Sequence, residues 1–530
     1  MKAGVIRILA FLLCLCTVLS QFGLPVSAEE AVETQPPQEQ EETAQPEREP
    51  ARDVTFGRTL EIVSGFPNYD MLMDRDIYMG QTGRNGAYIV MSNDLGIGSI
   101  YLVFMENYGT FSLKDNDTGE VRTCGGNGFL HEFVDVEALF GTAPQSLTLT
   151  FDSGSPYLNE IFAYSPGEVP SAIQKWKHPV ENETDLILFS AHGDDEHLFF
   201  AGILPYYAAE LGYEVLVVYL TDHQNNFGTM RMHEMLEGLW AVGVDTYPVF
   251  GEFADFRTSG LEKTYNVFAR LGTGYDTLMG FVVEQIRRFK PKVVVGHDFA
   301  GEYGHGQHVV YADLLSKSLE ITNDPEQYPE LAERYGVWDV PKAYFHMYTK
   351  NPIEMDWDQP LEYFGGQTAF QVSIYRGFAK HKSQLKDFQW WYHGADCATD
   401  IQLYSPCDYG LYRSTVGEDV LKNDFFENVA THTQDRLAEE ARLAEEVRLK
   451  AEAEARARAE EEARKAAQEA ADREKAEAEA LAKAEAEAAA QQAQLLEAQR
   501  RERITTIALI ASGALVLGLI LMQIFRKKKV

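Results

Sequence analysis

Cysteine is scarce in this chain: five occur among 530 residues, and two of them, Cys14 and Cys16, lie in an apolar N-terminal segment. Cys124, Cys397 and Cys407 remain, and no CxxC or CxxH pair is present. A thiolate metal site is therefore disfavoured. Cys397 and Cys407 are close enough in sequence to form a small disulfide loop, and free buried thiols are the equal alternative.

Positive charge is also in short supply, because 47 Lys and Arg face 81 Asp and Glu and give a formal net charge of -34. Nucleic-acid binding requires clustered cations, so we expect no nucleic-acid partner. The length exceeds that of one compact domain, and two or three folded units with non-globular segments are expected.

The N-terminus has the pattern of a secretory signal. Lys2 and Arg7 precede an apolar run over residues 8–19, and Val26-Ser27-Ala28 is a small-x-small cleavage pattern. Residues 1–28 are therefore predicted to be a signal peptide. Residues 29–53 are dense in Glu, Gln, Pro and Thr and contain few large apolar side chains, which predicts a disordered linker.

Glycine and proline are absent from residues 434–503, where Ala, Glu, Arg and Lys dominate. These residues favour a helix without an apolar face, which predicts a stalk over 433–503. A solvated single helix is preferred to a self-associating coiled coil. Residues 504–525 carry no charge and are long enough to span a bilayer, and the basic tail 526–530 predicts a cytoplasmic C-terminus with the rest outside.

Residues 54–177 contain short β-rich runs separated by Gly, Asn and Asp, which is typical of an antiparallel β-sandwich. The clearest runs are residues 87–91, 99–104, 146–151 and 160–164. Residues 115–119 have oxygens spaced as in a calcium loop but lack the distal Glu, so a hairpin turn is preferred. Residues 158–164, followed by Pro170 and Trp176, resemble the end of galactose-binding-like modules, which implies glycan binding; a purely structural sandwich is the alternative.

Residues 183–432 alternate buried strand runs with amphipathic segments, which predicts an α/β domain with a Rossmann-like, mostly parallel sheet. The expected strands are residues 186–189, 215–219, 246–250 and 293–295. The expected helices are residues 197–211, 230–242 and 279–289.

Polar side chains follow two of these strands. The sequence SAHGDDE at residues 190–196 follows the first, and GHGQH at 304–308 lies after the strand at 293–295. Parallel strands place such loops at one edge of the sheet, so imidazoles and a carboxylate can converge there as ligands for a catalytic Zn²⁺. Of the neighbouring carboxylates Asp194 and Asp195, one can bind the metal while the other faces the reacting water.

These motifs resemble those of the PIG-L (LmbE-like) zinc-dependent de-N-acetylases. AHGDDE at 191–196 is similar to the AHPDDE signature, and GEYGHGQH at 301–308 is similar to the second motif. Thr221-Asp222 and the RMHE sequence at 231–234 match two intervening elements. The resemblance is strong over about residues 185–313 and is expected to continue to Glu427. Gly193 stands where the family usually has Pro, which softens the loop without removing a functional group.

Carried over by position, the resemblance implies roles for seven residues. One Zn²⁺ would be bound by His192, Asp195 and His308. Asp194 would be the general base, protonated His305 with Tyr303 as a helper would stabilise the oxyanion or protonate the amine, and Arg231 would line the substrate pocket. Outside this set, Glu196 and His197 are expected to support a helix start, and His381 is expected to be a packing residue. His297 and Asp298 are expected to lie near the site, where they either support the ligands or contact substrate.

The sequence thus predicts an exported, membrane-tethered zinc hydrolase that removes N-acetyl groups from N-acetylglucosamine-type units of a surface or external glycan. The alternatives are an inactive surface glycan-binding protein and an amidase for another N-acyl group. The predicted segments are a signal peptide (1–28), a linker (29–53), a β-sandwich (54–177), a deacetylase domain (183–432), a stalk (433–503), a transmembrane helix (504–525) and a basic tail (526–530).

Overall fold

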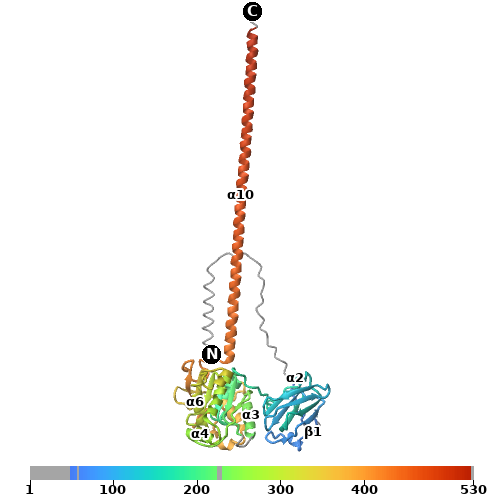
Figure 1. Cartoon of the computed structure of the whole chain (residues 1–530), viewed down its shortest axis with the longest axis vertical. Coiled ribbons are helices and arrows are strands. Elements are labelled where there is room, and N and C mark those ends of the chain that lie inside the picture. The colour runs from blue at the N-terminus through green and yellow to red at the C-terminus, as the bar shows by residue number, and fades with distance from the viewer. Residues whose placement is uncertain (1–47, 56–58, 224–228, 527–530) are drawn as a thin grey trace.

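The computed structural model describes residues 48–55, 59–223 and 229–526. The predicted signal peptide, residues 29–47 of the predicted linker and residues 527–530 lie outside the described residues. Figure 1 shows two folded parts side by side and one long helix that extends away from them.

The first folded part is built from two antiparallel sheets with strand orders β1-β3-β8-β5-β6 and β2-β9-β4-β7. Inward residues from both sheets, among them Ile89, Leu149 and Ile161, form one core. The strands are β1 (Leu60–Ser64), β2 (Gln81–Thr82), β3 (Ala87–Ser92), β4 (Ser99–Phe104), β5 (Thr110–Asp115), β6 (Val121–Gly125), β7 (His131–Asp135), β8 (Ser146–Phe151) and β9 (Tyr157–Tyr164), with the short helices η1 (Tyr69–Leu72) and α2 (Val136–Phe140).

The sequence made two local predictions for this part, one for the loop after β5 and one for residues 48–53. The loop after β5 is a hairpin turn, in which Asp115 Oδ1 accepts the Asp117 N–H at 2.8 Å and Asp115 Oδ2 accepts the Thr118 hydroxyl at 2.7 Å. Residues 48–53, assigned to the linker, are instead ordered against the sandwich: the Ala51 N–H donates to Glu168 O at 2.8 Å. The linker prediction was wrong here because backbone pairing does not depend on apolar side chains.

The second folded part is a mixed α/β unit with a seven-stranded sheet in the order β12-β11-β10-β13-β14-β16-β15. The first five strands in this order, β12, β11, β10, β13 and β14, are parallel to one another. Strand β16 runs antiparallel to both β14 and β15. The strands are β10 (Leu186–Ser190), β11 (Val215–Tyr219), β12 (Val249–Phe250), β13 (Val293–Gly296), β14 (Lys342–His346), β15 (Pro352–Glu354) and β16 (Asp408–Ser414).

Helices cover both faces of this sheet. Along β10, Leu186 and Leu188 belong to one core while Ile187 and Phe189 belong to the other, as expected for a parallel sheet buried on both sides. The helices are η2 (Pro205–Glu210), α3 (Thr229–Ala241), α4 (Leu261–Arg270), α5 (Tyr275–Phe289), η3 (Glu302–Gly304), α6 (Gly306–Ser318), α7 (Pro329–Tyr335), α8 (Ala369–Val372), η4 (Ser373–Gly377), η5 (Phe378–Lys380), α9 (Leu385–Tyr392) and η6 (Ala398–Asp400).

The helix predicted at residues 197–211 is only partly present. Residues 194–202 form turns, and η2, a π-helix, occupies Pro205–Glu210. Gly202 interrupts the helical path at φ +99°, and a Cβ there would lie 2.3 Å from the Trp357 ring. Close packing against Trp357 therefore overrides the helical pattern. The expected strand at 246–250 is also shorter, with β12 limited to Val249–Phe250.

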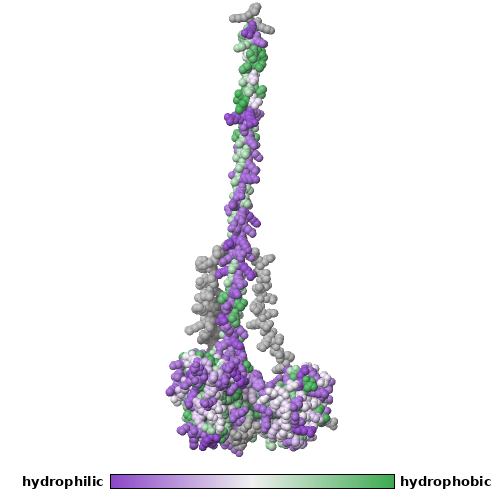
Figure 2. Space-filling view, viewed as in Figure 1, coloured by the Kyte–Doolittle hydropathy of each residue, from purple (hydrophilic) through white to green (hydrophobic). Residues whose placement is uncertain are grey.

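The chain ends in a single helix, α10, over His432–Arg526, and none of its side chains is buried. Exposed ion pairs such as Arg448 with Glu445 and Glu452 run along it. Figure 2 shows a hydrophilic shaft followed by a hydrophobic segment near its far end. By length and composition, this one helix among the described residues could cross a membrane. Cys124, Cys397 and Cys407 are free thiols, so the disulfide alternative was wrong.

Candidate active site

The loop that follows β10 is held in a strained conformation by its own side chains. Asp194 has φ +148°, a region that non-glycine residues rarely occupy. Its N–H donates to Glu196 Oε2 at 2.8 Å, and the His192 N–H donates to Asp195 Oδ2 at 3.0 Å. Strain that is fixed by such contacts is typical of functional loops.

The three predicted metal ligands meet at this loop. His192 Nδ1 lies 3.2 Å from Asp195 Oδ2 and 3.1 Å from His308 Nε2, and the latter two atoms are 3.2 Å apart. Tetrahedral ligands at bond lengths of about 2.0–2.1 Å lie roughly 3.3–3.4 Å apart. All three side chains are buried. The triangle therefore has the size of one face of a zinc-type coordination shell.

Outer hydrogen bonds orient the two imidazoles toward this triangle. His192 Nε2 lies 3.2 Å from Gln307 Oε1, and His308 Nδ1 lies 2.7 Å from Glu302 Oε2. Each ring thus donates on its outer side and presents its other nitrogen to the centre. Although burial opposes it, the carboxylates of Asp195 and Glu302 raise the pKa of His308 to about 10. That local field would equally favour a metal cation.

The Glu302 carboxylate contacts three histidine rings beside the triangle. Besides His308, its carboxylate lies 2.8 Å from His297 Nδ1 and 2.6 Å from His346 Nδ1. Burial alone would raise its pKa, but His297 and the three hydrogen bonds lower it well below the usual value. A permanently charged carboxylate here fixes the tautomers of its partners.

His297 could in principle join Asp195 and His308 as a third ligand, since its Nε2 lies 3.6 Å from Asp195 Oδ2. That nitrogen already accepts the Ala191 N–H at 2.8 Å, and Nδ1 is engaged with Glu302. Both ring nitrogens are therefore occupied, and His297 supports the loop, one of the two roles expected for it.

Asp194 points its carboxylate toward Arg231. Arg231 Nη2 lies 3.2 Å from Asp194 Oδ2 and donates to Gly193 O at 2.7 Å. Burial raises the pKa of Asp194 well above its usual value, Asp195 and Glu196 add to this, and Arg231 offsets it in part. A carboxylate with a raised pKa is a stronger base. The predicted substrate residue Arg231 thus contacts the predicted base directly.

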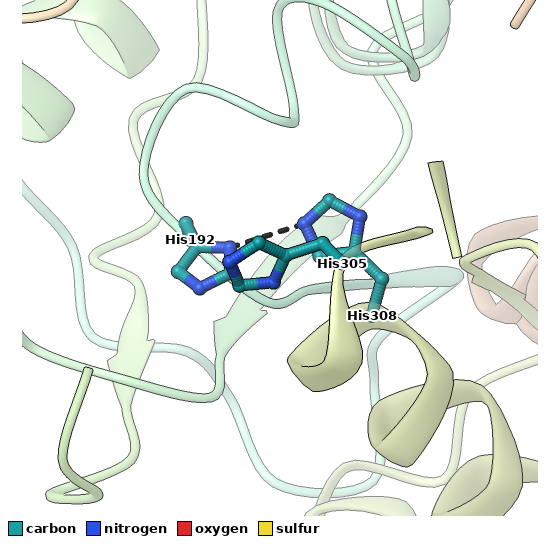
Figure 3. Close-up of side chains that lie close together, drawn as sticks. All are labelled: His192, His305 and His308. Carbon is teal, nitrogen blue, oxygen red and sulfur yellow. Dashed lines mark hydrogen bonds between the residues drawn. The ribbon is translucent and has the colours of Figure 1, made fainter. Parts of the chain in front are cut away.

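His305 precedes α6 and stands beside the ligand rings, 4.6 Å from His192 and 4.8 Å from His308 between centroids (Figure 3). Burial and these two imidazoles lower the pKa of His305 to about 2. The ring is therefore neutral at rest, in contrast to the protonated state expected from the sequence. Tyr303, in a left-handed conformation at φ 45°, lies 5.6 Å from the His305 ring.

A cavity of about 620 Å³ opens onto this cluster. It contains His192, Asp194, Arg231, Tyr303 and His305, together with residues to which sequence reasoning assigned no catalytic or metal-binding role. These are Asp255, Phe256, Arg257, Gln384, Asp387, Phe388 and Trp390. Asp255, Phe256 and Arg257 follow β12, whereas Asp387, Phe388 and Trp390 lie on α9, so only the fold brings them to the first motif.

The unusual Gly193 has a local explanation. A Cβ on Gly193 would lie 2.1 Å from Met235 Cγ, and the Gly193 N–H donates to His223 Nε2 at 2.9 Å. Proline would lose this donor. Burial and Arg231 lower the pKa of His223 to about 3, so its neutral ring donates from Nδ1 to Asp255 Oδ2 at 2.9 Å. Glycine therefore allows a His223–Asp255 pair to brace the loop.

Residues 187–318 match the model of the PIG-L family, described as GlcNAc-PI de-N-acetylase. This chain contains a PIG-L domain. The resemblance seen in the motifs is thereby confirmed. The 1D-myo-inositol 2-acetamido-2-deoxy-alpha-D-glucopyranoside deacetylase of Streptomyces avermitilis is 28% identical over 180 residues, which is 30% of this chain and 60% of that protein. Deacetylase 2 of that name from Saccharopolyspora erythraea is 31% identical over 179 residues, 30% of this chain and 64% of its own length.

This chain thus spans less than two thirds of the length of these curated relatives. Among solved structures, N,N'-diacetylchitobiose deacetylase from Pyrococcus horikoshii aligns with a TM-score of 0.29 and 14% identity, covering 44% of this chain and 83% of that one.

Proposed function

We propose that the PIG-L domain is a metal-dependent hydrolase that removes acetyl groups from N-acetylated amino sugars of the N-acetylglucosamine type. The observation that carries this proposal is the triangle of His192 Nδ1, Asp195 Oδ2 and His308 Nε2, with edges of 3.1–3.2 Å. The curated relatives are named as deacetylases of a 2-acetamido sugar, which supports the reaction class.

The donor set of this triangle suits one Zn²⁺ ion, because two imidazole nitrogens and one carboxylate oxygen are its common ligands. The second oxygen of Asp195, Oδ1, is buried without a hydrogen-bond partner among the described residues, as a ligand carboxylate can be. When bound, the ion would supply Lewis acidity to polarise the amide carbonyl and acidify water. His305 is the other imidazole in reach, and we assign it to substrate because its ring borders the cavity.

The remaining side chains divide the proton transfers. Asp194 takes a proton from the attacking water while Arg231 holds the carboxylate in place. The water oxygen bonds to the amide carbon, the C–N bond breaks, and the proton passes to the amine as acetate is released. The N–H of neutral His305 and the Tyr303 hydroxyl are hydrogen-bond donors for the carbonyl oxygen as it gains charge.

The cavity supports a sugar substrate. Phe388 and the half-exposed Trp390 provide aromatic faces on which a sugar ring can stack, and Asp387 and Arg257 provide polar contacts for hydroxyls. We further propose that the enzyme is exported and anchored by residues 504–525, so that its substrate is a surface or external glycan. The signal pattern at 1–28 and the apolar end of α10 support this location.

Acetate release by the purified full-length chain in detergent tests the proposal. With Zn²⁺ and an N-acetylglucosamine oligomer, we expect acetate and free amine in equal amounts. Asp194→Asn should bind metal normally and lose activity, whereas Asp195→Asn should lose both. Equal acetate release by Asp194→Asn would contradict the assigned base, and an inactive wild-type chain that still binds the oligomer would favour a glycan-binding protein.

A further inference from the structure

Behind the catalytic loop lies a second cluster of metal-type ligands: Glu196, His197 and His381. All three side chains are fully buried, and one ligand atom from each lies within 4.8 Å of the others. Glu196 and His197 come from the turns after β10, and His381 follows η5. The cluster shares no residue with the His192–Asp195–His308 triangle. The sequence suggested a helix start for Glu196 and His197 and packing for His381, whose ring stacks on Phe378.

Most polar atoms of this cluster have no hydrogen-bond partner of normal geometry among the described residues. Within residues 48–55, 59–223 and 229–526, Glu196 Oε1 and both ring nitrogens of His197 and of His381 are buried without a hydrogen bond of normal geometry. The Tyr219 hydroxyl, which lies near Glu196, also has no hydrogen bond of normal geometry. Burying so many unsatisfied polar atoms together is strongly unfavourable, and native proteins avoid it unless water or an ion completes the site.

The spacing distinguishes these possibilities. Glu196 Oε1 lies 3.6 Å from His197 Nε2 and 3.5 Å from His381 Nε2. Both distances exceed those of normal N–H···O hydrogen bonds, which are about 2.7–3.2 Å long. They are close to the roughly 3.3–3.4 Å that separates ligands of a tetrahedral zinc-type ion. The arrangement is therefore better suited to a shared cation than to direct hydrogen bonding.

Glycine leaves the room that such a centre needs. A Cβ on Gly238 of α3 would lie 2.6 Å from His197 Nε2 and 2.9 Å from His381 Nε2. Both nitrogens thus face the same small space beside α3. A Cβ on Gly377 would lie 2.5 Å from His197 Nδ1, so glycine also permits close packing on the far side of that ring.

We propose that Glu196, His197 and His381 bind a second divalent transition-metal ion of the Zn²⁺ class, through Glu196 Oε1 and the two Nε2 atoms. Two imidazoles and one carboxylate are ligands of borderline softness, which excludes Ca²⁺ and Mg²⁺ as preferred occupants. The other oxygen, Glu196 Oε2, accepts the Asp194 N–H at 2.8 Å. The ion therefore has a positioning role, since it fixes the strained loop that carries Asp194 and Asp195.

Metal counting on the full-length chain tests this site. Bound metal is first removed from the chain in detergent with a chelator. Zn²⁺ or Co²⁺ alone is then added, free metal is removed by desalting, and the bound ions per chain are counted by elemental mass spectrometry. Two ions per wild-type chain are expected. His381→Gln and Gly238→Ala should each retain one, because the added Cβ of Gly238→Ala fills the space of the ion while every ligand residue is still present. His308→Gln should also retain one, and His308→Gln with His381→Gln should retain none.

The outcomes separate this site from the proposed catalytic metal. One ion in the wild type that is lost in His308→Gln and kept in His381→Gln overturns the second site and leaves the proposed function intact. One ion with the reverse pattern supports the second site and removes the metal from the proposed function. If variants misfold, anomalous diffraction at the zinc edge on the wild-type chain decides, and an ordered water among the three side chains overturns the proposal.

Discussion

His192 Nδ1 lies 3.1 Å from His308 Nε2, although the two residues are 116 positions apart in the chain. Two imidazole nitrogens at this distance repel each other unless a proton or a cation lies between them. Both nitrogens also face Asp195 Oδ2 at 3.2 Å. A cation at the centre would satisfy all three atoms at once, whereas a proton can satisfy only one pair.

Loss of the Glu302 charge should weaken metal binding without removing a ligand. In Glu302→Gln the contact to His308 Nδ1 loses its charge, and support of this kind is worth about 10–100-fold in metal affinity. Competition with a chromophoric chelator measures the change. His346→Gln is the matched control, since His346 contacts the other oxygen of Glu302. Equal affinities for Glu302→Gln and wild type would contradict the orienting role.

Gly193 and Met235 should be coupled energetically. Gly193→Ala places a Cβ 2.1 Å from Met235 Cγ, and such overpacking is expected to lower the free energy of unfolding by about 1–3 kcal/mol. Met235→Ala removes the side chain that the new Cβ would meet. In the Met235→Ala background, Gly193→Ala should therefore lower the free energy of unfolding much less than it does in the wild-type protein. Denaturant unfolding of the four proteins measures the coupling. Additive effects would show that Met235 is not the obstacle.

Glu160 should make the sandwich less stable as pH rises. Burial raises the pKa of this carboxyl to about 8 from its usual 4.5, so the folded state holds the proton more tightly than the unfolded state. Its contribution to stability is complete below pH 4.5 and is lost as pH rises through about 8. The melting temperature of Glu160→Gln, measured from pH 5 to 9, should fall less than that of wild type. Parallel curves would contradict the shifted pKa.

The apolar end of α10 should decide how the chain partitions. A chain that ends at Arg503 lacks the uncharged run 504–525 and should remain in solution without detergent, while the full chain should sediment with membranes. Since no side chain of α10 is buried, the truncated protein should release acetate at the wild-type rate. Membrane association of the truncated chain would place the anchor elsewhere.

Long, strongly patterned elements were predictable from the sequence. The runs at 99–104, 146–151 and 215–219 coincide with β4, β8 and β11, because alternating or continuous apolar residues reflect burial directly. The convergence of His192, Asp195 and His308 was also predictable, since parallel strands bring their following loops to one edge.

What could not be predicted depends on contacts between distant segments. Gly202 breaks a helical pattern because Trp357 packs against it, and His381 reaches Glu196 only through the fold. Neither relationship leaves a local signal in the sequence. The ordered conformation of residues 48–53 was not predicted for a related reason. It depends on backbone hydrogen bonds to the end of the sandwich.

The uninterrupted α10 has a consequence for which substrates the enzyme can meet. Between His432 and Arg503 a straight helix spans roughly 110 Å, whereas a flexible linker of equal length would average only about 40–50 Å between its ends. In the proposed topology, rigidity would therefore hold the active site away from the lipid surface. If the proposed function holds, glycans close to the membrane would escape deacetylation, and those farther from it would be modified.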